Sequence, residues 1–151
     1  MHQVFGKQED AVYTHREGAY LIAVDGDRIA VIQTPKGYFF LGGGIDPSEA
    51  HEACIRRECE EEIGYTVSVG ECLCSAEAYT YHERIGYFHP IQTYYVGMLE
   101  QRIKTPVETD HMLVWLTWDQ LRGNLYAEMQ NWALEQYLST PGCRLSQASG
   151  G

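Results

Sequence analysis

Two short apolar runs near the start of the chain are separated by a pair of turn-forming residues. Residues 19–24 (AYLIAV) and 29–32 (IAVI) are apolar and partly β-branched, as strands are. Gly26 and Asp27 stand between them and favour the tight turn of a hairpin. A second turn at 34–37 precedes a short aromatic strand at 38–41, which leads into three consecutive glycines. The pattern predicts a β-hairpin followed by a third strand.

The residues after the glycines carry the start and stop signals of a helix. Asp46 is a residue type that caps helix N-termini, Pro47 suits the first helical position, and Glu49 stands where its side chain reaches back to the amide of the cap. Gly64 is the residue type that most easily takes the left-handed conformation ending a helix. We therefore predict a helix over residues 47–63 with Asp46 as its cap.

The second half of the chain carries further strand patterns and one closing helix. Three segments show strand-like apolar and aromatic residues: 66–77, 91–99 and 114–118. Over residues 126–138, apolar residues recur at the three-to-four spacing of an amphipathic helix. This order of elements predicts one α/β domain over residues 1–138, with a mixed β-sheet between helices. Residues 139–151 gather Gly, Ser and Pro, and we expect this tail to be disordered.

Composition and charge narrow the class of protein. The 151-residue chain has 21 Asp and Glu against 11 Lys and Arg, a formal net charge of -10, which disfavours binding to bulk nucleic acid. No apolar run approaches the ~18 residues that a membrane-spanning helix needs. The N-terminus lacks the pattern of an export signal. We therefore expect a cytoplasmic protein that binds neither membranes nor bulk nucleic acid.

Acidic residues concentrate in the predicted helix. Residues 46–62 hold seven carboxylates against two arginines. Glu58, Glu61 and Glu62 lie at i, i+3 and i+4 and therefore share one helix face. Such a face is either solvated surface or a metal site. If it binds a metal, oxygen ligands without Cys or His favour Mg2+ or Mn2+ over zinc. Its neighbours favour the metal site, since the glycine turn brings backbone groups close and Arg57 can orient a carboxylate through a forked hydrogen bond.

Glycine and charged residues occur at fixed spacing across residues 43–65: Gly43, Glu49, Arg57, Glu58, Glu61, Glu62 and Gly64. Together they resemble the Nudix box, G-x5-E-x7-R-E-U-x-E-E-x-G-U, in which U is a bulky apolar residue. Cys59 and Tyr65 occupy the apolar positions, and Leu41 stands where many members have proline. These departures concern packing more than chemistry. The order of strands on either side also resembles the α/β/α sandwich of the Nudix superfamily, of which MutT-like proteins are members.

The resemblance implies a role for each acidic residue of the helix face. Glu58, Glu61 and Glu62 would bind Mg2+, or Mn2+ in its place, together with the main-chain oxygen of Gly42. Arg57 would position these carboxylates. The catalytic set implied by the resemblance is therefore Glu62, Glu61, Glu58 and Arg57.

The resemblance also implies the reaction and leaves part of it open. Family members use metal-activated water to cleave a pyrophosphate bond in a nucleoside diphosphate linked to another group. The general base varies, so we name Glu62 first, with Glu108 and Asp110 as candidates from a later loop, while Glu49 would brace the junction of loop and helix. The substrate is a nucleoside triphosphate, a dinucleoside polyphosphate or a nucleotide sugar. The alternative function is a non-catalytic Nudix-like sensor that binds a nucleotide metabolite.

Outside the box, two sets of residues are candidates for contact with the substrate. One set either stacks a base or belongs to the core of the sheet: Tyr79, Tyr81, His82, Tyr87, Phe88 and His89. The other set is basic and either meets phosphates or is solvated: Arg16, Arg28, Lys36 and Arg84. The aromatic content also leaves room for a homodimer.

Overall fold

The structure of the chain is a computed structural model that describes residues 1–106 and 110–140. Glu108, one candidate for the general base, and residues 141–151 of the predicted tail lie outside the described residues. In chain order the elements are β1 (His2–Phe5), β2 (Thr14–Asp25), β3 (Arg28–Thr34), β4 (Gly37–Phe39), β5 (Leu41–Gly44), α1 (His51–Ile63), β6 (Tyr65–Ala78), β7 (Thr80–His82), β8 (Gly86–Arg102), β9 (Met112–Thr117), α2 (Trp118–Leu121) and α3 (Glu128–Leu138).

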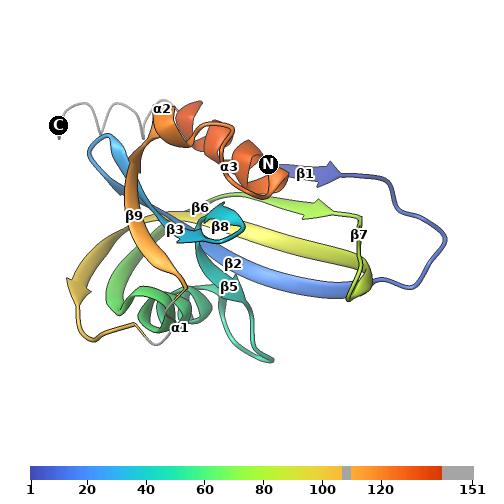
Figure 1. Ribbon diagram of the computed structural model, residues 1–151, viewed down its shortest axis with the longest axis horizontal. Coiled ribbons are helices and arrows are strands. Elements are labelled where there is room, and N and C mark those ends of the chain that lie inside the picture. Colours follow the sequence, from blue (N-terminus) through green and yellow to red (C-terminus); the bar gives the residue numbers. More distant parts are fainter. Residues whose placement is uncertain (107–109, 141–151) are drawn as a thin grey trace.

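The strands form one mixed sheet between two layers of helix. The order across the sheet is β1-β6-β8-β2-β3-β4, while β5, β7 and β9 pair with β2, β8 and β3 respectively. The β1–β6 and β2–β8 pairs are parallel, and pairs such as β2–β3 and β6–β8 are antiparallel. Helix α1 covers one face of the sheet, and α2 and α3 cover the other (Figure 1). The predicted α/β/α sandwich is confirmed.

A hydrophobic core lies on each face of the sheet because successive side chains of a strand point to opposite faces. Leu21 belongs to the core that includes Ile55 of α1, whereas its neighbour Ile22 belongs to the core that includes Leu134 of α3. All four side chains are fully buried, and burial of one such side chain contributes about 1.5–3 kcal/mol. The sheet is thus held from both sides and forms a rigid support for the residues at its surface.

Helix α1 begins later than its sequence signals predict. Its first residue is His51, its N-cap is Ala50, and Ser48 has a left-handed backbone with φ 65°. The main-chain amide of Asp46 does donate to Glu49 Oε1 at 3.0 Å, as predicted, but this bond closes a turn that precedes the helix. The predicted start at Pro47, with Asp46 as the cap, is therefore wrong, because the left-handed Ser48 interrupts the helical backbone. The predicted end is confirmed at Ile63.

The other predicted elements occur close to their expected positions. The hairpin is confirmed, with Asp25 opposite Arg28 and a two-residue turn between them. The three later strand segments lie in β6, β8 and β9, but β8 is longer than predicted because it runs from Gly86 to Arg102. Trp118 begins α2 instead of ending a strand, and α3 begins at Glu128 rather than residue 126. No apolar pattern indicated β1 and β7, because they are short and mostly exposed. No helix within the described residues has the length and apolarity needed to cross a membrane.

Gly64 at the end of α1 should be intolerant of any side chain. Its φ is +72°, and a Cβ atom there would lie 2.0 Å from the main-chain oxygen of Lys104. We expect Gly64→Ala to lower the free energy of unfolding by more than about 2 kcal/mol, since strain and a backbone clash add. Gly26→Ala is the control, because its φ is +62° with open space around it, and it should cost only about 1–2 kcal/mol. Equal losses in urea titrations would contradict this.

Candidate active site

Strand β5 brings its glycines against the acidic face of α1. The main-chain amide of Gly42 donates to Glu62 Oε1 at 3.2 Å. A Cβ atom on the next residue, Gly43, would lie 2.6 Å from the carboxyl carbon of Glu58. Only a glycine at position 43 therefore lets Glu58 lie where it does, and the carboxylates of Glu58 and Glu62 are placed beside consecutive residues of one strand.

Arg57 gathers the neighbouring carboxylates. Its Nε and Nη2 donate to the two oxygens of Glu49 at 2.8 and 2.9 Å, and its Nη2 also donates to the main-chain oxygen of Gly44 at 3.1 Å. Its Nη1 donates to Glu58 Oε1 at 2.8 Å and lies 3.5 Å from Glu61 Oε2. The hydrogen bond to Glu49 is the largest cause that raises the pKa of the Arg57 guanidinium above its ordinary value. Arg57 thus stays charged and ties the loop before α1 to two of the predicted metal ligands.

The Glu49–Arg57 pair should make stability depend on acid pH. The hydrogen bond from Arg57, followed by that from the Asp46 amide, lowers the pKa of Glu49 from 4.5 to about 2. The contribution of the Glu49 carboxylate to the free energy of unfolding is therefore complete above pH 4.5 and is lost as the pH falls towards 2. We expect the difference in free energy of unfolding between the wild type and Glu49→Gln to be constant from pH 7 to 5 and to shrink between pH 4.5 and 2. A difference that stays constant down to pH 2 would show that the pair has no such role.

Two of the predicted metal ligands, Glu58 and Glu61, lie beside Arg57, and the third, Glu62, lies against β5. Glu58 and Glu61 both lie within 3.5 Å of the same Arg57 nitrogen, Nη1. Glu62 accepts a hydrogen bond from the main-chain amide of Gly42, the residue before Gly43. All three supply carboxylate oxygens, which fit Mg2+ or Mn2+. Within residues 1–106 and 110–140, however, no three His, Cys, Asp or Glu side chains already stand as a metal-binding group. The ligand roles, including that of the Gly42 main-chain oxygen, therefore stay predictions.

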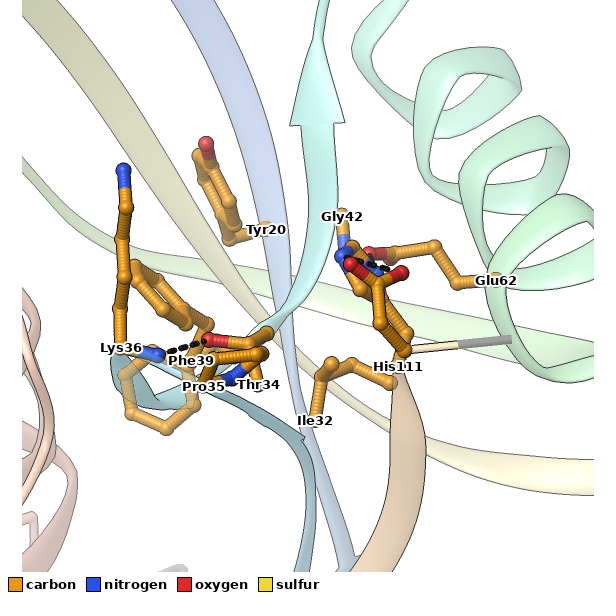
Figure 2. Close-up of a pocket in the computed structure, with 11 residues that line it drawn as sticks. Tyr20, Ile32, Thr34, Pro35, Lys36, Phe39, Gly42, Glu62 and His111 are labelled. Atoms are coloured by element: carbon orange, nitrogen blue, oxygen red, sulfur yellow. Dashed lines mark hydrogen bonds and ion pairs between the residues drawn. The ribbon is translucent and has the colours of Figure 1, made fainter. Parts of the chain in front are cut away.

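A cavity of about 390 Å³ opens beside Glu62. Its lining is Tyr20, Ile32, Thr34, Pro35, Lys36, Phe39, Phe40, Gly42, Glu62, Asp110 and His111. Figure 2 shows Gly42, Glu62 and His111 together on one side of this cavity, with Lys36 and Phe39 on the other. Burial is the largest cause that raises the pKa of Tyr20 to about 12, so its hydroxyl stays protonated at neutral pH. The cavity thus joins an acidic end to an aromatic wall.

Two residues from the loop before β9 reach this acidic end. His111 Nδ1 lies 3.6 Å from Glu62 Oε2, and Asp110 Oδ1 lies 4.0 Å from His111 Nε2. Asp110, a predicted candidate for the general base, is largely exposed but lines the cavity. Sequence reasoning missed His111 because it lies far from the box and has no metal-ligand spacing.

The aromatic segment predicted as a possible base-stacking surface lies elsewhere. Tyr79 stacks on His89 with ring centroids 4.3 Å apart, and Tyr13 packs edge-on against Tyr79 and Tyr87. None of the six candidate aromatic and imidazole residues lines the cavity beside Glu62. Of the four basic candidates only Lys36 lines it, although the Arg16 guanidinium lies close to Gly44.

The sandwich, the acidic helix face and the adjoining cavity define a class of hydrolase. Residues 14–137 match the NUDIX domain family, so this chain belongs to the Nudix hydrolases. Members of this family act on pyrophosphate bonds of small nucleotide-derived substrates.

Solved structures of similar fold include several from the same family. A MutT NUDIX hydrolase from Burkholderia pseudomallei is 25% identical, with 82% of this chain and 98% of that chain covered and a TM-score of 0.66. A mutator MutT protein from Bacillus halodurans is 19% identical, with 83% of each chain covered and a TM-score of 0.70. The ORF135 protein of E. coli is 22% identical, with 87% of this chain and 94% of that chain covered and a TM-score of 0.62. No curated protein matches the sequence.

Proposed function

We propose that this chain uses Mg2+ to hydrolyse a pyrophosphate bond in a nucleoside diphosphate linked to another group. The observation that carries the proposal is the position of Glu62, whose carboxylate is bonded to the Gly42 amide and also forms part of the cavity wall. Glu58, Glu61, Glu62 and the main-chain oxygen of Gly42 would hold the cation. Mg2+ bound there supplies positive charge that neutralises the pyrophosphate and acidifies water.

The chain's own residues would divide the remaining work. Arg57 holds Glu58 and Glu61 beside each other through its Nη1. Glu62 accepts the proton of the attacking water as the water oxygen bonds to phosphorus and the bridging P–O bond breaks. Glu62 is suited to this step because it is only 8% exposed yet lines the cavity. Asp110 is the second candidate for the proton acceptor.

The cavity supports a substrate with one nucleoside held beside the acidic end. Its volume of about 390 Å³ lies within the range of about 300–1,000 Å³ typical of small-molecule sites. Its walls are aromatic and aliphatic at Ile32, Phe39 and Phe40, which suits the flat, weakly polar body of a base. Nucleoside triphosphates, dinucleoside polyphosphates and nucleotide sugars all meet this requirement.

The test measures turnover of these three substrate classes by phosphorus NMR. Each reaction is run once with Mg2+ and once with excess chelator. We expect an anhydride signal to be replaced by monophosphate or pyrophosphate signals only when Mg2+ is present. Tight nucleotide binding with no product from any class would instead indicate a sensor and overturn the proposal.

A further inference from the structure

We propose that Lys36 is a specificity-determining residue that recognises a carbonyl oxygen on the base of the substrate. This inference rests on the proposed function, because it takes the acidic end of the cavity as the place of the pyrophosphate. It concerns the opposite wall, where the turn between β3 and β4 carries Lys36 (Figure 2).

The turn that carries Lys36 is fixed by its own hydrogen bonds. The Lys36 amide donates to Thr34 Oγ1 at 3.0 Å, and Thr34 Oγ1 donates to the main-chain oxygen of Gly37 at 3.2 Å. Tyr126 covers this turn from outside, with its Cβ 3.4 Å from the position of a Cβ on Gly37. The backbone of Lys36 is therefore held at the cavity rim while its side chain extends along the wall.

The ammonium group of Lys36 has no ion pair or hydrogen bond to any other described residue, in contrast to Lys104, which lies 3.4 Å from Glu60. Lys36 and Glu62 line opposite sides of the cavity (Figure 2). In a chain of net charge -10, a cation in a cavity wall without a partner among residues 1–106 and 110–140 is available to a ligand group that accepts hydrogen bonds.

The surroundings of Lys36 indicate which part of the substrate it meets. Phe39 and Pro35 form the wall beside it, and the Phe39 ring is supported by Tyr126 at a centroid distance of 5.3 Å. This apolar wall suits the face of a base, whereas the phosphates belong with the cation at the acidic end. Lysine donates hydrogen bonds and accepts none, so it pairs with a base carbonyl and not with an exocyclic amino group.

Matched substrates isolate this single contact. Inosine and adenosine triphosphates differ at position 6 of the base, which is a carbonyl in the first and an amino group in the second. Uridine and cytidine triphosphates differ in the same way at position 4. We expect wild type to prefer the carbonyl member of each pair, and Lys36→Met to lower kcat/KM for that member about tenfold while changing the amino member less than twofold.

Lys7→Met is the control, because Lys7 is also an exposed lysine but lies outside the cavity; it should change neither value. Equal losses on both members of a pair would place Lys36 on phosphate or ribose and overturn the inference, as would no loss on either member. Calorimetric Kd values for the same nucleotides are measured in parallel with Ca2+. If no nucleotide is hydrolysed, the proposed function fails, and the ratio of Kd values within each pair still decides the role of Lys36.

Discussion

Glu62→Gln is expected to lower kcat/KM for the best substrate by about 1,000-fold while the fold persists. Glutamine has the same shape, and its amide oxygen can still accept the hydrogen bond from the Gly42 amide, which is 3.2 Å long in the wild type. It carries no negative charge for a cation and is a poor proton acceptor. Steady-state kinetics with Mg2+, together with urea unfolding, measure the two effects separately.

Glu60→Gln is the matched control for this variant. Glu60 lies on the same helix but is exposed and pairs with Lys104 at 3.4 Å. We expect its kcat/KM to remain within twofold of the wild type. If Glu62→Gln retained activity within tenfold of the wild type, the proton acceptor would have to be another group, and Asp110→Asn would be the next variant to assay.

Arg57→Lys is expected to lower kcat/KM by about 100-fold and the free energy of unfolding by about 2 kcal/mol. Lysine keeps the charge but cannot bond Glu49 through two nitrogens while a third nitrogen bonds Glu58, as Arg57 does. The loop before α1 would therefore lose its link to the metal ligands. Activity assays and urea titrations measure both changes.

Arg56→Lys provides the comparison for this effect. Arg56 is the adjacent residue and bonds Glu52 and the main-chain oxygen of Val67, both away from the cavity. Its replacement should leave kcat/KM within twofold of the wild type. Similar activity losses for the two substitutions would mean that Arg57 acts through general helix stability and not by positioning carboxylates.

The sequence predicted those parts of the fold in which the spacing of hydrophobic residues follows directly from burial in a core. Leu21 and Ile22 alternate between the two cores, so the hydrophobic pattern reports the strand directly. The start of α1 was misjudged because Asp46 and Glu49 carry the signals of a cap, yet the backbone turns left-handed at Ser48 before the helix begins. Local signals identified the correct hydrogen bond but not the path of the chain.

The candidate site likewise contains residues that are close together in the sequence, which could be predicted, and residues that only the fold brings together, which could not. Glu58, Glu61 and Glu62 could be proposed from the sequence because their spacing on a helix defines a common face. His111 reaches the cavity from the loop before β9, and no spacing along the chain links it to the box. The segment from Tyr79 to His89 is as aromatic as a base-binding wall, but its rings pack on one another, which composition cannot reveal.

Mn2+ binding, measured by electron paramagnetic resonance, tests the metal site most directly. The account predicts that wild type binds Mn2+ and that Glu58→Gln and Glu62→Gln each weaken this binding by tenfold or more, whereas Glu60→Gln does not. Unchanged Mn2+ affinity in both of the first two variants would contradict the assignment of these carboxylates as ligands.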